Sequence, residues 1–345
     1  MQMDGLDKNG VNTAGASGTG QASDAPHRRL GLTDAEITSI GLGCWQFSEG
    51  VGLAGSFWPV LSQDQVNEIV ACSLAGGITW FDTAEAYGNG RSEQALSRAL
   101  IQAGKKPGEV LIATKWMPVF RTSASVRVTI GERLARLSPF PIDLYQVHNP
   151  WGLSSVEAEM NAFADLISAG QIRFAGVSNF DEPQMRRAHA ALKARGLPLA
   201  SNQVKYNLLD RRIEWNGVLS AAKELGVTII AYSPLEQGIL SGKFHRDPSL
   251  LAKVRGSRRF MPAFRKSRLP RTQPLIDELG SIAKAHGASC SQVALAWLIS
   301  FHGGTVVAIP GASKLSQAEE NVAAMRLSLT RAELAHLDDV SRRLQ

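Results

Sequence analysis

The sequence predicts an α/β protein that folds as a closed, parallel (β/α)8 TIM barrel, with an N-terminal hairpin and extra C-terminal helices. Short apolar runs rich in β-branched residues alternate with stretches of helical periodicity, a pattern typical of a parallel sheet covered by helices. Eight such runs occur, most of them about 30 residues apart, and this spacing fits a barrel better than an open sheet. The length of 345 residues also suits one barrel.

The strands are predicted from these runs in chain order. They are Ile40–Trp45, Ile78–Phe81, Val110–Thr114, Ile142–Val147, Arg173–Val177, Ala200–Val204, Val227–Ala231 and Thr305–Ile309. A short segment before the first strand, Arg29–Ile37, is expected to form a hairpin that closes the bottom of the barrel.

Helices are predicted where apolar residues recur at helical spacing. The clearest are Gln65–Leu74, Glu93–Ile101, Val156–Ile167, Val218–Leu225 and Leu334–Val340. Ser62 and Ser155 stand where an N-cap is needed, and glycines follow several helices. The long gap between the seventh and eighth strands holds two further helical stretches, Pro274–Ala285 and Ser291–Ser300.

A single barrel domain is expected over residues 28–345, after a leader at 1–27 that is rich in Gly, Ser and Ala and is expected to be disordered. The leader lacks the apolar segment of a secretory signal, and no apolar run reaches the roughly 18 residues of a membrane helix. Three widely spaced cysteines, Cys44, Cys72 and Cys290, match no metal-ligand spacing and indicate a reducing compartment. We therefore expect a cytoplasmic protein with no membrane partner.

The net charge of +6 is unevenly distributed, because seven cations and no acid occur between residues 255 and 271. They are Arg255, Arg258, Arg259, Arg265, Lys266, Arg268 and Arg271. Such a cluster is typical of nucleic-acid contact, of contact with an anionic cofactor or substrate, or of a solvated basic loop. We expect no nucleic-acid partner, and the sequence leaves the role of this loop and the oligomeric state open.

Polar side chains stand at the ends of most predicted strands. They are Asp82, Lys115, His148, Ser178 with Asn179, Gln203, and Tyr232 with Ser233. The carboxyl ends of the strands form one face of a (β/α)8 barrel, and the chemistry of such barrels lies on that face. The sequence therefore predicts that these side chains converge on one site.

Three of these residues, Asp82, Lys115 and His148, form a coherent proton-donating set with Tyr87, which lies on the loop after the second predicted strand. A tyrosine with an ordinary pKa near 10 is a weak acid at neutral pH, and we expect a nearby Lys115 ammonium to lower the pKa of Tyr87. An ammonium held away from water needs a carboxylate, which Asp82 supplies. His148 can hydrogen-bond a substrate carbonyl, and Gly88 helps the Tyr87 loop to turn tightly. No metal-ligand cluster is found, so we expect no metal.

The chain resembles the aldo-keto reductases over about residues 28–340. The resemblance is carried by the motifs GLGCWQF, GITWFDTAEAYGNGRSEQALSRAL, IATKW, IDLYQVHNP, IRFAGVSNF, NQVKYN, IIAYSPLEQGILSGKF and IPGASKLSQAEEN. It implies a barrel that binds NADPH in extended form and reduces aldehydes or ketones to alcohols by direct hydride transfer, without metal. The last motif and the long loop after the seventh strand are similar to bacterial members and to the β-subunits of voltage-gated potassium channels.

The resemblance also implies a role for each site residue. Tyr87 is the proton donor, Lys115 and Asp82 tune it, and His148 orients the carbonyl. The implied cofactor contacts are Gly43, Cys44, Trp45 and Asp82 at the rim; Ser178, Asn179 and Gln203 at the nicotinamide amide; Tyr232 on its ring; Ser233, Leu235, Gln237, Gly238 and Lys243 at the pyrophosphate; and Gly311, Ser313, Lys314, Gln317, Glu320 and Asn321 at the adenosine end.

The choice between NADPH and NADH rests on the last segment. The best-known mammalian-type members grip the 2′-phosphate with a lysine and an arginine, where this chain has Gly311 and Gln317. Ser313 offers a hydroxyl and a backbone N–H, Lys314 offers a cation, and a predicted helix begins just beyond them. We therefore predict NADPH, gripped by Ser313, Lys314 and Gln317, with NADH the less expected cofactor.

The sequence does not predict the natural substrate beyond a small-molecule carbonyl compound. Five aromatic residues indicate an apolar mouth, although some of them can instead belong to the core: Trp45, Phe47, Trp58, Trp116 and Trp151. A second class of function stays open, a nicotinamide-sensing binding module or channel-type β-subunit with residual activity. Very slow hydride transfer with tight cofactor binding would distinguish that class.

Overall fold

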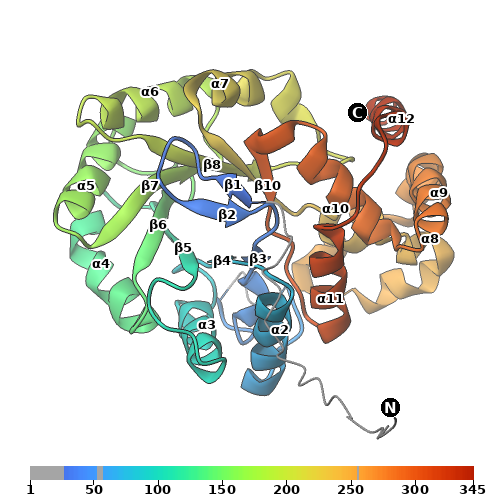
Figure 1. Ribbon diagram of the computed structural model, residues 1–345, viewed down its shortest axis with the longest axis horizontal. Coiled ribbons are helices and arrows are strands. Elements are labelled where there is room, and N and C mark those ends of the chain that lie inside the picture. The colour runs from blue at the N-terminus through green and yellow to red at the C-terminus, as the bar shows by residue number, and fades with distance from the viewer. Residues whose placement is uncertain (1–26, 53–56, 255) are drawn as a thin grey trace, which may run out of the picture.

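Eight parallel strands form the centre of the protein, and helices surround them (Figure 1). The computed structural model describes residues 27–52, 57–254 and 256–345. The predicted leader lies outside these residues except for His27, which begins strand β1. The parallel strands are β3 (Leu42–Gly43), β4 (Trp80–Asp82), β5 (Leu111–Trp116), β6 (Ile142–Val147), β7 (Ile172–Ser178), β8 (Leu199–Lys205), β9 (Thr228–Tyr232) and β10 (Val306–Ala308).

The strands are paired in chain order, and the first and last of them meet. Parallel bridges join Ile40 to Ala308 and Gly43 to Gly311, and the Gly41 amide donates a hydrogen bond to the Ala308 carbonyl over 2.9 Å. This closure confirms the predicted (β/α)8 architecture. It also places the carboxyl ends of all eight strands around one mouth.

The first strand is shorter than predicted. β3 spans two residues, and Trp45 belongs to a 3-10 turn, η1 (Trp45–Phe47). The chain leaves the sheet at Cys44, where its amide donates to the Asp82 carbonyl at 2.8 Å and its carbonyl accepts from the Ser92 hydroxyl at 2.6 Å. These bonds turn the chain over the barrel mouth.

The helices around the barrel are α2 (Gln63–Ala75), α3 (Arg91–Gln102), α4 (Ala124–Leu137), α5 (Val156–Ser168), α6 (Glu182–Lys193), α7 (Val218–Leu225), α10 (Cys290–Ser300) and α11 (Leu315–Ala324). Some of them begin at a side-chain cap. Ser62 forms a capping box with Gln65, and the Ser155 side chain accepts from the Ala158 amide. The apolar periodicity of the sequence did not predict α4 and α6.

The predicted hairpin lies across the bottom of the barrel. It consists of β1 (His27–Arg29) and β2 (Glu36–Thr38), paired antiparallel, and Figure 1 shows it across the centre of the strands. Ile37 packs with Trp80 in the lower core, and the Trp80 indole donates to the Thr38 carbonyl at 2.9 Å. The Arg28 guanidinium donates to the carbonyls of Ile299 and Val306, 271 and 278 positions away.

The long segment between β9 and β10 begins at the barrel mouth and continues into outer helices. It contains η3 (Glu236–Ser241), α8 (Lys243–Arg246), η4 (Pro248–Lys253), η5 (Gly256–Phe260), η6 (Pro262–Phe264), η7 (Lys266–Arg268), α9 (Leu269–Ala285) and α10. With α12 (Arg331–Arg342), the helices α8 and α9 lie on one side of the barrel (Figure 1). The predicted extra C-terminal helices are therefore present.

A buried arginine ties α12 to the barrel. The fully buried Arg211 guanidinium forms ion pairs with Glu214 at 2.7 Å and with Asp338 of α12 at 2.5 Å. It lies over the faces of Trp297 and Phe301, with 5.0 and 5.4 Å to the ring centroids. Across the described part of the chain, the helices are all too short or too polar to cross a lipid bilayer.

Candidate active site

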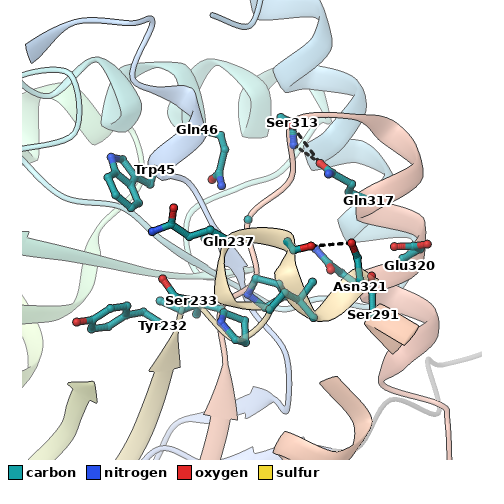
Figure 2. A pocket seen from close by; sticks show the side chains of 18 of the residues that line it. Trp45, Gln46, Tyr232, Ser233, Gln237, Ser291, Ser313, Gln317, Glu320 and Asn321 are labelled. Atoms are coloured by element: carbon teal, nitrogen blue, oxygen red, sulfur yellow. Dashed lines mark hydrogen bonds between the residues drawn. The ribbon is translucent and has the colours of Figure 1, made fainter. Parts of the chain in front are cut away.

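An elongated cavity of about 960 Å³ opens at the carboxyl ends of the strands. Every residue of the predicted site lines it except Lys115, which is fully buried and contacts two lining residues, Asp82 and Tyr87. Figure 2 shows Trp45 and Tyr232 at one end of the cavity, and Gln317 of α11 toward the other. The strand ends thus bring together residues from across the chain.

The charged pair lies at the closed end of the cavity. Asp82 is the last residue of β4, and its Oδ1 accepts a hydrogen bond from Lys115 Nζ of β5 at 2.5 Å. Lys115 Nζ also donates to the Thr83 carbonyl at 2.8 Å. Burial lowers the pKa of Lys115, but Asp82 and Tyr87 together raise it by more than burial lowers it. The pKa of Lys115 therefore lies above its ordinary value. Lys115 is therefore a cation at neutral pH.

The hydroxyl of Tyr87 faces this ammonium. Lys115 Nζ lies 3.4 Å from Tyr87 Oη and 4.9 Å from the centre of the phenol ring. Burial raises the pKa of Tyr87 more than Lys115 lowers it, and the negative charge of Asp82 raises it again. The predicted net lowering is therefore wrong: Tyr87 is a protonated phenol at neutral pH, with a cation beside the oxygen that becomes negative once the proton leaves.

His148 lies edge-on to Tyr87, with 5.7 Å between ring centroids. Burial, and then the positive charge of Lys115, lower the pKa of His148 to about 3. The imidazole is therefore neutral at physiological pH. Its Nδ1 is buried and forms no hydrogen bond among the described residues. A neutral ring can donate one hydrogen bond to a ligand oxygen but is not a source of protons.

The residues predicted at the nicotinamide form a connected polar group. The Tyr232 hydroxyl donates to Asn179 Oδ1 at 3.0 Å, and Asn179 Nδ2 donates to Ser178 Oγ at 3.1 Å. Gln203 Nε2 donates to Asp82 Oδ2 at 2.8 Å, an additional contact that the sequence did not indicate. These bonds fix the side chains before any ligand binds.

The loop after β9 has an unusual backbone. Ser233, Glu236 and Gln237 adopt positive φ angles of 50°, 45° and 53°, and Gly238 adopts 96°. Such conformations cost about 1–3 kcal/mol each in a residue other than glycine, and they cluster at ligand sites. The carboxylate of Glu236 holds the loop by accepting from Lys205 Nζ at 2.8 Å and from Asn207 Nδ2 at 2.8 Å.

Unpaired cations gather above this loop. Burial lowers the pKa of Lys243, and the charges of Arg258 and Lys314 lower it further, so the three lie within electrostatic reach of one another. All three line the cavity, and within the described ranges they form no ion pair with an acid. This arrangement is suited to a polyanionic ligand.

Arg258 gives the basic loop one defined contact with the cavity. Its guanidinium lies 4.2 Å from the centre of the Trp58 ring and donates to the Gln237 carbonyl at 2.9 Å. Of the alternatives that the sequence left open for residues 255–271, this placement favours contact with an anionic cofactor or substrate. Arg255 itself lies outside the described residues.

At the far end, the segment before α11 carries the predicted phosphate grip. Gln317 lines the cavity, and its Oε1 accepts from the Ser313 amide at 2.8 Å, while Lys314 is exposed. Figure 2 shows the bonds between Ser313 and Gln317. A Cβ atom at Gly311 would lie 2.1 Å from Gln46 Oε1, so any larger residue there would require the Gln46 side chain to move. The side-chain amide nitrogen of Asn321 is buried without a protein partner among the described residues.

The five aromatic residues predicted at the mouth separate into three groups. Trp45 and Trp58 line the cavity, with ring centroids 5.7 Å apart, and Trp45 stacks on Tyr87 at 5.9 Å. Phe47 and Trp116 are 1% and 0% exposed and belong to the core. Trp151 is 64% exposed and does not line the cavity. The substrate end is thus apolar, with fewer aromatic walls than the sequence indicated.

Several lining residues were not singled out from the sequence. They include Gln46, Ala86, Met117, Arg246, Lys284 and Cys290. Met117 directly follows β5, so the strand-end rule could have found it. The others lie on helices or turns, where nothing in the sequence distinguishes them. No cluster of three or more metal-ligating side chains occurs among the described residues.

Comparisons with known proteins agree with this geometry. A sequence model of the aldo/keto reductase family matches residues 39–342. A Mycobacterium tuberculosis protein named uncharacterized oxidoreductase Rv2298 is 39% identical over 307 residues, which cover 89% of this chain and 90% of that protein.

Solved structures are similar over most of the chain. The glycerol dehydrogenase AKR11B4 from Gluconobacter oxydans is 29% identical with a TM-score of 0.79, covering 92% of this chain and 95% of that one. An aldo/keto reductase from Klebsiella pneumoniae, solved in complex with NADP and acetate, is 27% identical with a TM-score of 0.69, covering 91% and 95%.

Proposed function

The chain belongs to the aldo/keto reductase family, and we propose that it reduces an aldehyde or ketone to an alcohol with NADPH, with Tyr87 as the proton donor. The observation that carries the proposal is the buried Lys115 ammonium, 2.5 Å from Asp82 Oδ1 and 3.4 Å from Tyr87 Oη. A phenol that is protonated at rest, beside a cation that stabilises its anion, is suited to give up a proton as a carbonyl oxygen becomes negative.

Each residue around the cavity has a separate role in the proposed reaction. Tyr87 holds the proton to be transferred, and Lys115 stabilises the phenolate oxygen that remains. His148, neutral because its pKa is lowered to about 3, donates a hydrogen bond that orients the carbonyl oxygen toward Tyr87. Trp45 and Trp58 exclude water on the substrate side.

A dinucleotide would lie along the length of the cavity. A reduced nicotinamide supplies the hydride. Tyr232 and Asn179 would hold the nicotinamide end, and the cations Lys243 and Arg258 would meet the pyrophosphate. The unpartnered amide of Asn321 offers a donor to the adenosine end. An NADP complex of the Klebsiella pneumoniae relative is consistent with this assignment.

The first test is the oxidation of NADPH by the purified protein in the presence of a panel of aliphatic, aromatic and sugar-derived carbonyl compounds. We expect multiple turnovers with at least one class, and alcohol formed in equal amount to the NADPH consumed. Tight NADPH binding without turnover on the whole panel would instead support a nicotinamide-sensing role.

Replacement of Lys314 by alanine should weaken NADPH binding selectively. Only NADPH carries a 2′-phosphate, and a lost charge-assisted contact costs on the order of 1.5–3 kcal/mol. Because Lys314 is exposed, solvent screens its charge, and we expect a cost at the lower end of this energy range. The KM for NADPH should then rise about tenfold. The KM for NADH should be unchanged, and Arg331→Ala, on α12, is the matched control. Equal use of the two cofactors by the wild type would contradict this grip.

The pH dependence of kcat in His148→Gln, compared with that of the wild type, tests whether the His148 ring is neutral during the reaction. Because the His148 pKa is lowered to about 3, the imidazole acquires a proton only as the pH falls toward that value. The ratio of wild-type to His148→Gln kcat should therefore be constant between about pH 5 and about pH 8. A ratio that follows a titration near pH 6.5, the ordinary value for histidine, would show that the ring is charged during the reaction.

A further inference from the structure

Two carboxylates, the half-buried Glu85 and the fully buried Glu93, stand on either side of Tyr87 in the sequence, and one guanidinium binds both. Glu85 precedes Tyr87 by two residues, and Glu93 lies in the first turn of α3. Arg133 of α4, with a side chain only 2% exposed, donates through Nε to Glu93 Oε2 at 3.1 Å and through Nη1 to Glu85 Oε2. The segment 85–93, which carries the phenol, is thus held at both ends by one side chain.

The same carboxylates are also bonded to β5, the strand that carries Lys115. Glu85 Oε1 accepts from the Met117 amide at 2.5 Å, and the Glu85 amide donates to the Lys115 carbonyl at 3.3 Å. Glu93 Oε1 accepts from the Thr114 hydroxyl at 2.6 Å. Through these carboxylates, Arg133 therefore connects both ends of the Tyr87 segment to Thr114, directly before Lys115, and to Met117, two residues after it.

We propose that Arg133 is a positioning residue, which sets the place of the Tyr87 hydroxyl relative to the Lys115 ammonium. This inference rests on the proposed function, in which that hydroxyl gives the proton. Arg133 itself does not line the substrate cavity and touches no reacting atom. It acts only through the two carboxylates.

The chemistry of the side chain supports a positioning role over simple stabilisation. A buried ion pair is often no more stabilising than apolar residues of the same volume, because charges lose their hydration on burial. A planar guanidinium presents donors in a rigid fork, so it fixes the directions of two carboxylates at once, which an ammonium cannot do. A displacement of about 1 Å at a reacting group can cost roughly 100-fold in rate.

A second cavity makes the proposal testable by chemical rescue. It has a volume of about 570 Å³ and is lined by Glu85, Arg133, Arg121 and Arg136, among others. Since Arg133 forms part of its wall, a free guanidinium ion can enter from solvent and occupy the space that Arg133→Ala creates.

The experiment compares Arg133→Ala with Arg127→Ala, which removes an exposed arginine of the same helix that pairs with Asp165. We expect Arg133→Ala to lower kcat by about 10- to 100-fold, with the Kd for NADPH within about twofold of wild type. Guanidinium chloride, at concentrations that do not affect the wild type, should restore part of kcat, whereas sodium chloride or urea should not. Arg127→Ala should keep the wild-type kcat.

The remaining outcomes are decisive as well. The positioning role is overturned if Arg133→Ala keeps full kcat. It is also overturned if Arg133→Ala loses both kcat and cofactor binding and guanidinium restores neither. If Arg133→Ala does not fold, Arg133→Lys, whose ammonium lacks the rigid fork, should fold with lowered kcat, and full kcat there also overturns it.

A readout without activity separates this inference from the proposed function. If the wild type reduces no carbonyl compound, the proposed function fails, but amide hydrogen exchange still tests the clamp. Exchange over residues 85–93 should be faster in Arg133→Ala than in Arg127→Ala. Equal exchange in the two variants would overturn the clamp itself.

Discussion

Replacement of Tyr87 by phenylalanine should lower kcat for carbonyl reduction by about 10²- to 10⁴-fold, the usual contribution of a general acid. The substitution removes one oxygen and leaves the ring, so the stacking on Trp45 at 5.9 Å is retained. The Kd for NADPH, measured by fluorescence titration, should therefore stay within about twofold of wild type.

Tyr145→Phe provides the matched control for this substitution. Tyr145 is buried, and its hydroxyl has no hydrogen-bond partner among the described residues, so its removal should leave kcat unchanged. If Tyr87→Phe keeps near-wild-type kcat with its best substrate, then another group donates the proton and the assignment of Tyr87 is wrong.

Replacement of Lys115 by methionine should be comparably damaging to the rate and should also destabilise the fold. Without the ammonium, nothing stabilises the phenolate that Tyr87 becomes, so kcat should again fall by about 10²- to 10⁴-fold. Asp82, 1% exposed, would be left as a buried charge without its cation, at a cost of about 3–5 kcal/mol in the free energy of unfolding.

A double variant separates the two effects of Lys115. In Asp82→Asn/Lys115→Met both charges are absent, and Gln203 and Gln146, which donate to Asp82 Oδ2 in the wild type, still have an amide oxygen as acceptor. Urea denaturation should show most of the stability restored relative to Lys115→Met alone, while kcat stays low. Recovery of both stability and kcat would mean that the charge on Lys115 has no part in the reaction.

The barrel and the placement of its site could be predicted because both follow from local patterns. Apolar runs identified each strand to within a few residues, and the strand-end rule placed Asp82, Lys115 and His148 on one face. The resemblance to aldo-keto reductases, based on short motifs, is confirmed by the family match over residues 39–342. Cofactor choice and residue roles stay predictions.

The remaining features depend on contacts between distant parts of the chain. Arg133 is buried on α4 between Ile130 and Leu137. A charged residue at this position interrupts the apolar periodicity, so the periodicity did not predict this helix. The carboxylate partners Glu93 and Glu85 of this arginine are 40 and 48 positions away. The net rise in the pKa of Tyr87 depends on burial, which residue spacing does not reveal.

Closure of the barrel has a consequence for synthesis on the ribosome. The Gly43–Gly311 bridge and the bond from Arg28 to Val306, 278 positions along, join the two ends of the described chain. A nascent chain that has not yet emerged beyond Gly311 leaves β3 and β9 as open sheet edges, which are templates for wrong pairing. The sheet is completed only after Gly311 has emerged, so β3 stays an exposed edge that chaperones can recognise throughout the synthesis of β4 to β10.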